Sequence, residues 1–281
     1  MNYGKLIEAH RAFYIGENRA KNYDKYMTEQ KDWKAWQTPS ISATEAEKLF
    51  HFVRSWDRFF RGDSSIFQRI YQEIYPLIRD LGNERIESVN LNDAELKARI
   101  SDAFDRVADC TAIRRYESTD ASKVLHAILP DFFVMWDDKI KNWTVNGGND
   151  GRTYADEFLP KMQQELNEAI ESCVTEMKLG RARAVDYIRE QCGHETLAKL
   201  ADEYNYVKYT LKNPSLGGME TLNVTKHGAP VIHPRETNIA QKQIEFAKFV
   251  EELKKKRAKG DENRERVKQW QREHREQPQT P

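Results

Sequence analysis

The residues whose types and spacing could do chemistry are concentrated in the segment 118–140. A polar cluster opens a helical stretch, Pro130 ends it, and the apolar run 132–136 leads directly into Asp137 and Asp138. An apolar run of this kind must be buried, so it places the first carboxylate at the edge of a hydrophobic environment, beside the start of the next helix. We therefore expect partial desolvation and the neighbouring helix start to determine how this carboxylate behaves.

This arrangement resembles the active-site stretch of the helix-hairpin-helix DNA glycosylase superfamily, in which a helix is followed by an apolar segment of the type Pro-x-x-Phe-Pro-x-x-Asp. The likeness covers 118–140 well and the helical sequence on either side more loosely. It implies that Asp137 corresponds to the catalytic aspartate of the family. Asp138 is the alternative, because a slip of one residue in the alignment exchanges the two.

The resemblance also implies a reaction. The target base leaves the stack and enters a pocket, and its bond to C1′ breaks through an oxocarbenium-like state. A nearby carboxylate stabilises that cation and orients the attacking water. Family members with lyase activity use a lysine near this helix to form a Schiff base, and Lys123 lies 14 residues before Asp137. The alternative for Lys123 is a solvated lysine or one that contacts phosphate.

Further DNA contacts follow from the same likeness, and they are Ser118, Thr119, Ser122, Trp136 and Lys139. One departure concerns the hairpin, because the family has a Gly-x-Gly turn there and this chain has no glycine in 116–120. The helix start could still offer N–H groups to a phosphate, but Glu117 and Asp120 would oppose an anion. Either DNA is held elsewhere, or the resemblance extends to the fold alone.

A second group combines aromatic rings with arginines, which is the pairing that a flipped-base pocket needs. It consists of Arg54, Trp56, Arg58 and Arg61, with Trp33 and Trp36 upstream. The alternative is a helix that buries Trp56 and exposes its arginines. Arg181 and Arg183 at a helix start fit either a phosphate partner or ordinary surface charge. His126, on the same helix as Lys123, is interpreted as a packed core histidine.

The elements that must position these residues are helical by their apolar period. Spacings of three and four predict helices over 3–36, 45–61, 65–81, 93–115, 121–129, 138–143, 153–177, 180–192, 195–211 and 238–276. Ser42 or Thr44 is predicted to cap the second of them, and Ser118, Thr119 and Asp120 the fifth. The sequence thus predicts an all-α fold: a glycosylase-like core over 40–212, a helical extension over 1–39, and an irregular segment with a short β element followed by a long polar helix over 213–281.

Composition sets limits on function. Of 281 residues, 39% are hydrophobic, which is enough for a substantial core, and 45 basic residues balance 45 acidic ones, so any DNA-binding face must be local. Cys110, Cys173 and Cys192 are too far apart for a cysteine-based zinc site, and they predict reduced thiols, no metal and no cofactor. No apolar stretch is long enough to span a bilayer. We therefore expect a cytoplasmic protein.

The functional hypothesis is a DNA glycosylase acting on double-stranded DNA, either in antiviral defence against hypermodified phage bases such as glucosylated hydroxymethylcytosine or in base excision repair. The alternatives are a helical module that binds nucleic acid or protein, and a nucleoside hydrolase. A glycosylase requires Asp137 in a cleft lined by aromatics and rimmed by Lys or Arg. A binding module predicts Asp137 in a salt bridge and no cleft, and a nucleoside hydrolase predicts a closed pocket without a basic groove.

Overall fold

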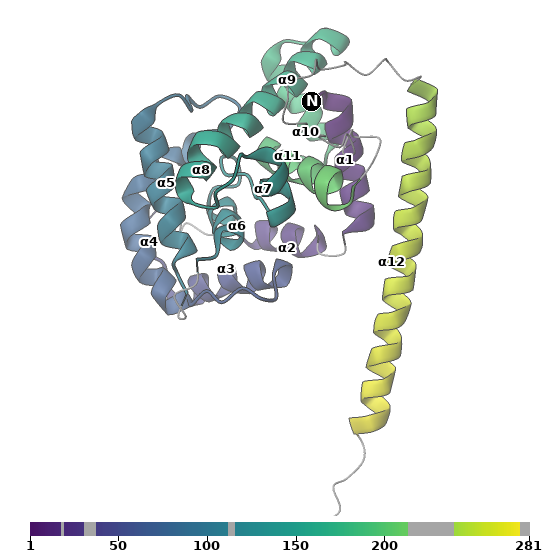
Figure 1. The fold of residues 1–281 in the computed structure, drawn as a ribbon, viewed down its shortest axis with the longest axis horizontal. Helices are drawn as coiled ribbons and strands as arrows, with labels where there is room; N and C mark the ends of the chain where they lie inside the picture. Colours follow the sequence, from purple (N-terminus) through teal and green to yellow (C-terminus); the bar gives the residue numbers. More distant parts are fainter. Residues whose placement is uncertain (18–19, 31–37, 112–115, 213–238, 276–281) are drawn as a thin grey trace, which may run out of the picture.

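The computed structural model describes residues 1–17, 20–30, 38–111, 116–212 and 239–275, and these residues form an all-α fold (Figure 1). The helices are α1 (Tyr3–Gly16), α2 (Ala20–Gln30), α3 (Ala43–Trp56), α4 (Ser64–Ile78), α5 (Ala94–Ala108), α6 (Ser118–Ile128), α7 (Asp138–Thr144), α8 (Gly151–Thr153), α9 (Leu159–Met177), α10 (Arg181–Gln191), α11 (Leu197–Asn205) and α12 (Ile239–Arg275). The predicted fold class is confirmed. Trp33, Trp36 and the segment predicted to be irregular, 213–235, lie outside the described residues.

The N-terminal segment contributes to the same hydrophobic core as the rest of the described chain. The sequence predicted one helix over 3–36, but the described part contains two, α1 and α2, because α1 ends at Gly16. Phe13 of α1 and Tyr23 of α2 are almost fully buried in the cluster that also holds Trp136. In Figure 1, α1 lies against α11, and the two helices make extensive contact.

Side-chain caps explain where several helices begin. Ser42 caps α3 as predicted, and its capping box with Glu45 satisfies backbone N–H groups that a helix start leaves without partners. Asp63 and Asp93 cap α4 and α5 through carboxylates that each accept from two backbone N–H groups of the first turn. The predicted cap of α6 is wrong: Glu117 occupies the N-cap position, so Ser118, Thr119 and Asp120 form the first turn.

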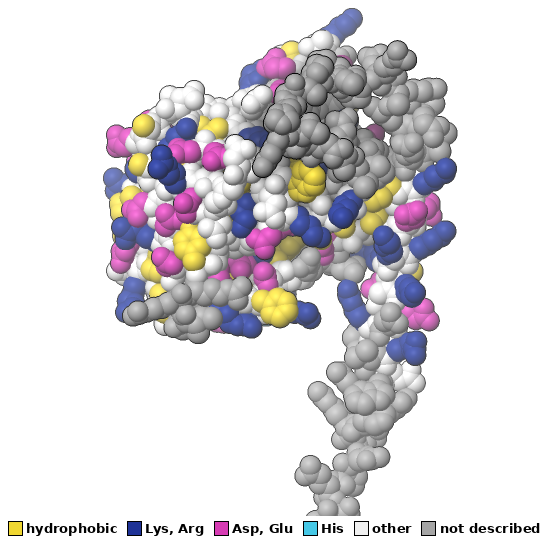
Figure 2. Space-filling view, viewed as in Figure 1, with side chains coloured by type: hydrophobic (Ala, Val, Ile, Leu, Met, Phe, Trp, Pro, Cys, Tyr) yellow, Lys and Arg dark blue, Asp and Glu magenta, His cyan; other side chains and the backbone are white. Residues whose placement is uncertain are grey.

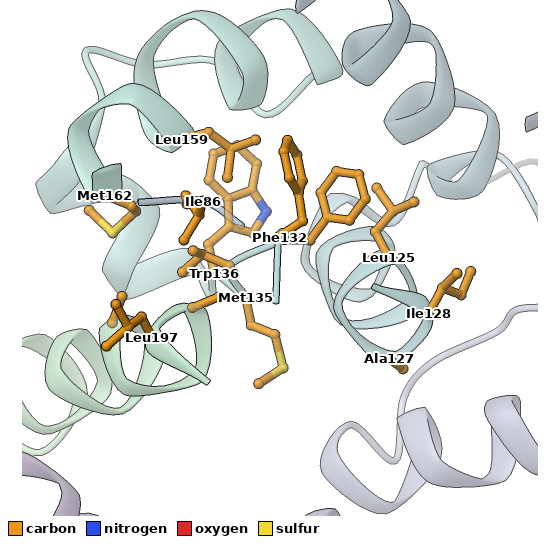
Figure 3. Packing of buried hydrophobic residues seen from close by; sticks show 14 of the residues in the cluster. Ile86, Leu125, Ala127, Ile128, Phe132, Met135, Trp136, Leu159, Met162 and Leu197 are labelled. Atoms are coloured by element: carbon orange, nitrogen blue, oxygen red, sulfur yellow. The ribbon is translucent and has the colours of Figure 1, made fainter. Parts of the chain in front are cut away.

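The apolar run before Asp137 is the centre of the core. Figure 3 shows Phe132, Met135 and Trp136 among side chains of α6, α9 and α11. Trp136 is 1% exposed, its indole Nε1 donates to the Ser118 carbonyl at 3.1 Å, and its backbone N–H donates to Ser122 Oγ at 3.1 Å. Burying one such side chain contributes about 2 kcal/mol, and the polar bonds fix its orientation. The residue that follows, Asp137, is therefore held in place.

Helix α12 extends away from the helical body (Figure 1). It is attached through Leu253, which is 6% exposed, and through Arg257, whose guanidinium donates to the carbonyls of Tyr14 and Ile15. Those carbonyls belong to the last turn of α1, where a cation is favourable. None of the helices in the described residues combines the length and the apolar character needed to cross a membrane.

Candidate active site

A cleft of about 450 Å³ opens at the segment that the sequence singled out, a volume typical of small-ligand sites. The loop after α3, the first turns of α6 and α7, and α11 surround it. Its aromatic lining is Trp56, Phe59, Tyr116, Trp136 and Tyr206; its acidic lining is Asp57, Glu117, Asp120, Asp137, Asp138 and Asp202; its lysines are Lys123, Lys139 and Lys141. All three predicted catalytic residues, Lys123, Asp137 and Asp138, thus line the same cleft.

Asp137 is a carboxylate fixed by two donors. It stands at the N-cap of α7, where Oδ1 accepts from the Ile140 backbone N–H at 2.7 Å and Oδ2 accepts from the Thr210 hydroxyl at 2.8 Å. Both bonds stabilise the negative charge. Asp137 makes no ion pair with any residue of the described ranges. Asp138 differs, because its side chain is 80% exposed and pairs with Lys141 at 3.0 Å.

Lys123 lies between two carboxylates of the cleft wall. Its Nζ is 2.9 Å from Asp120 and 3.7 Å from Asp57, and the side chain is 12% exposed. A Schiff-base nucleophile requires an uncharged amine, whereas these neighbours attract the ammonium. The sequence analysis considered a solvated lysine or a phosphate contact as alternatives for Lys123. In the structure, Lys123 is instead paired with carboxylates and orders the cleft wall.

Asp120, which the sequence predicted as part of a helix cap and as a charge opposing a bound anion, lines the cleft. It is 5% exposed, and burial raises the pKa of its carboxyl to about 6, against the opposing effect of Lys123. Asp57 and Glu117 raise this pKa further. A carboxyl with this pKa can exchange a proton near neutral pH.

Asp202 of α11 also lines the cleft, and it was not predicted as a site residue. Burial raises the pKa of its carboxyl to about 6, with Glu203 and Asp137 adding to the rise and Lys199 opposing it. All nine residues of α11 are buried, so Lys199, Asp202 and Glu203 are charged groups inside a core helix. The signal available beforehand was three charges at i, i+3 and i+4 among Leu and Ala, since buried charges of this kind are usually functional or paired.

The other contacts implied by the resemblance divide into two sets. Thr119 and the exposed Lys139 line the cleft and are accessible. Ser118 and Trp136 form its buried wall. The predicted DNA contact of Ser122 is wrong, because this residue is 0% exposed. Its hydroxyl donates to the Thr119 carbonyl and accepts from the Trp136 backbone N–H. It orders the joint between α6 and the apolar run and does not face the cleft.

The predicted aromatic and basic cluster is only partly assembled at the cleft. Trp56 lines it and is half-buried. Arg54 instead pairs with Glu47 at 3.2 Å and donates to the Gly62 carbonyl. Arg58 stacks on the exposed ring of Phe59, and Arg61 bonds backbone carbonyls next to it in sequence. The arginines thus lie outside the cleft lining. Arg58 is nevertheless close to it, because Phe59, on which Arg58 stacks, is a lining residue.

The remaining candidates have structural roles. His126 is confirmed as a core histidine: it is 0% exposed, and burial lowers its pKa to about 3. Its Nδ1 faces the Phe133 carbonyl at 2.6 Å and so carries the proton, which leaves Nε2 to accept from the Tyr23 hydroxyl. Arg181 pairs with Glu171, and Arg183 forms a bidentate pair with Glu190, as surface charges do.

Charge in the cleft is dominated by carboxylates, since six acidic residues face three lysines. Elsewhere on the face shown in Figure 2, acidic and basic side chains are interspersed. Within the described ranges, no group of three His, Cys, Asp or Glu side chains is arranged to hold a metal ion. Comparison with protein families, with curated proteins and with solved structures finds no match to this chain.

Proposed function

We propose that this protein is a DNA N-glycosylase whose catalytic carboxylate is Asp137. The observation that carries the proposal is the position of Asp137: an aspartate held by two hydrogen bonds, without an ion pair in the described part of the chain, in the wall of a 450 Å³ cleft lined by aromatic rings. This is the arrangement that separates a glycosylase from a binding module, for which a salt-bridged Asp137 and no cleft were expected. The helix-hairpin-helix resemblance of 118–140 adds to it.

The chemistry suits the residues. A base extruded from DNA would stack against the aromatic lining, which includes Trp56 and Tyr206. As its bond to C1′ lengthens, positive charge develops on the sugar, and the Asp137 carboxylate stabilises that charge within a partly desolvated cleft. Lys139, exposed at the rim, can contact a backbone phosphate. Water then adds to C1′ and leaves an abasic site.

The acidic lining favours a second candidate, a nucleoside hydrolase. Six carboxyl groups repel a phosphate backbone but tolerate an uncharged nucleoside, and they stabilise a sugar cation in either case. Asp137 would have the same role in both reactions. The difference lies in the substrate, so a free nucleoside and a DNA duplex must be compared in one assay.

The test compares wild type with Asp137→Asn on duplexes containing uracil, glucosylated hydroxymethylcytosine or other modified bases, with alkali used to cleave abasic sites. Asparagine also caps helices well, so α7 is retained. We expect strand breaks with wild type and a loss of at least about 100-fold in the variant. Asp138→Asn is the matched control, because this exposed neighbour should leave the rate nearly unchanged. Free nucleosides incubated in parallel identify a nucleoside hydrolase by release of base.

Equal activity of wild type and Asp137→Asn would exclude the assigned carboxylate. Absence of base release from every duplex and nucleoside, with duplex binding retained, would favour the nucleic-acid-binding module. A lyase would produce strand breaks without alkali and a covalent enzyme–DNA adduct when borohydride reduces the Schiff base. Loss of both in Lys123→Gln would identify Lys123 as the lyase nucleophile despite its ion pairs.

A further inference from the structure

Behind the cleft lies a lysine that is completely enclosed. Lys199 of α11 is 0% exposed, and its Nζ is 3.0 Å from Asp202 Oδ2 and 3.2 Å from Glu203 Oε1. Enclosing a cation costs several kcal/mol in desolvation unless partners surround it, and hydrophobic replacements are often as stable. A charge in this position therefore calls for a reason other than stability.

Aromatic rings complete the enclosure. Nζ of Lys199 lies 4.2 Å from the ring centre of Phe13, 4.9 Å from that of Tyr23 and 5.5 Å from that of Trp56. Ring faces attract a desolvated cation. Burial alone would lower the pKa of Lys199, but Glu203 and Asp202 raise it above its ordinary value. The ammonium is thus kept charged and kept in one place.

The two carboxyl partners of Lys199 face different surroundings. Glu203 is turned toward α1, where His10 Nδ1 lies 2.8 Å from its Oε2. Asp202 lines the cleft that also contains Asp137. One ammonium thus serves two carboxyl groups, and only one of the two is in reach of a ligand. Asp137 and Asp202 thus form a pair of carboxyl groups in one cleft. Enzymes that hydrolyse glycosidic bonds use such a pair, in which one carboxyl acts as the acid and the other stabilises the cation.

We propose that Asp202 is the general acid of this cleft, that Lys199 is its positioning residue, and that Asp137 acts on the sugar. The inference rests on the proposed N-glycosidic hydrolysis. The bond between C1′ and the base nitrogen breaks, its electron pair goes to the base, and the base nitrogen takes the proton of the Asp202 carboxyl. A water oxygen bonds to C1′ and gives a proton to Asp137. Solvent returns that proton to Asp202, so hydrolysis consumes one water.

The protonation state of Asp202 depends on every charged group that faces it. Lys199 and Glu203 are on its own helix, Asp137 faces it from α7, and His10 and Glu195 act through Glu203 and Lys199. With its pKa raised to about 6, the carboxyl is protonated in an appreciable fraction of molecules between pH 5 and 7. Base excision should therefore slow as pH rises through this range.

The decisive variant is Asp202→Asn, which keeps the shape of the side chain and leaves Lys199 paired with Glu203. We expect single-turnover base excision to fall by about 100-fold or more, and the decline of rate above pH 6 to disappear. Glu203→Gln is the matched control, because it removes the other carboxyl partner of the same lysine without touching the cleft. It should keep the decline of rate with rising pH, but shifted to lower pH, because the charge of Glu203 raises the pKa of Asp202.

A duplex carrying a cationic pyrrolidine in place of one deoxyribose separates the two aspartates, since it imitates the sugar cation and has no base to protonate. At pH 5, below the Asp202 pKa of about 6, Asp137→Asn should bind it at least about tenfold more weakly than wild type, whereas Asp202→Asn should bind it nearly as wild type does. Equal rate losses in Asp202→Asn and Glu203→Gln, or an unchanged pH profile in Asp202→Asn, would overturn the role of Asp202. Failure of wild type to excise any base or to prefer pyrrolidine over a neutral abasic analogue would instead remove the proposed function, and this inference with it.

Discussion

In this protein, burial is the main cause that shifts the pKa of two ionisable side chains in opposite directions. Asp120 and His126 are on the same helix, and both are buried. Burial raises the pKa of the first to about 6, at the wall of the cleft, and lowers that of the second to about 3, in the core. One carboxyl is thereby brought into the range of acid–base chemistry, and the imidazole is removed from it.

His126 gives a testable pH dependence of stability. Its folded-state pKa is lower than the unfolded value of about 6.5, so the unfolded chain binds the extra proton and stability is lost as pH falls below about 6.5. His126→Asn retains a donor for the Phe133 carbonyl but cannot titrate. We expect its stability deficit relative to wild type to shrink by about 1 kcal/mol per pH unit between pH 6 and 4.5, measured by urea unfolding. A deficit independent of pH would show that His126 is accessible to protons in the folded state.

Among the elements, α5 and α8 pack so closely that only glycine fits at their contact. A Cβ on Gly151 would lie 2.2 Å from the Ser101 carbonyl oxygen, and the Gly151 N–H donates to Asp105 at 2.6 Å. We expect Gly151→Ala to destabilise the fold by about 1–3 kcal/mol, because the backbone of α5 cannot move aside. Gly82→Ala is the control, since its Cβ would meet nothing within 4 Å. Equal unfolding midpoints for the two variants would mean that the helices can separate at this contact.

Local sequence signals predicted the elements better than the contacts between them. The period of apolar residues located most helices, and Ser42, one of the two predicted caps, does cap α3, because a cap depends on residues close in sequence. Asp137 was predicted because the apolar run before it fixes its position. Asp202 was not predicted, because its place in the cleft depends on α11 packing against α1, which is far away in sequence. The start of α6 was misplaced because Glu117 is held by the backbone of Arg61, far away in sequence.

At the scale of the whole molecule, one core joins both ends of the described chain. Phe13 near the N-terminus and Leu253 in α12 belong to the same cluster as Trp136. The wall of the cleft therefore combines residues from α6, α7 and α11, and its geometry depends on α1 packing behind it. The predicted division at residue 39 corresponds to no break in this cluster, since Tyr23 and Phe52 contact each other across it.

The extended position of α12 determines how the particle moves in solution. Its 37 residues rise about 55 Å, whereas a compact chain of 281 residues has a radius of gyration of about 19 Å. Small-angle scattering should give a clearly larger radius, and rotational diffusion should be anisotropic. Size-exclusion chromatography should show elution ahead of compact standards of 33.0 kDa, with light scattering returning the monomer mass. A monomer with a radius near 19 Å would mean that α12 folds back on the body. An elongated monomer would be easily mistaken for a dimer by elution volume alone.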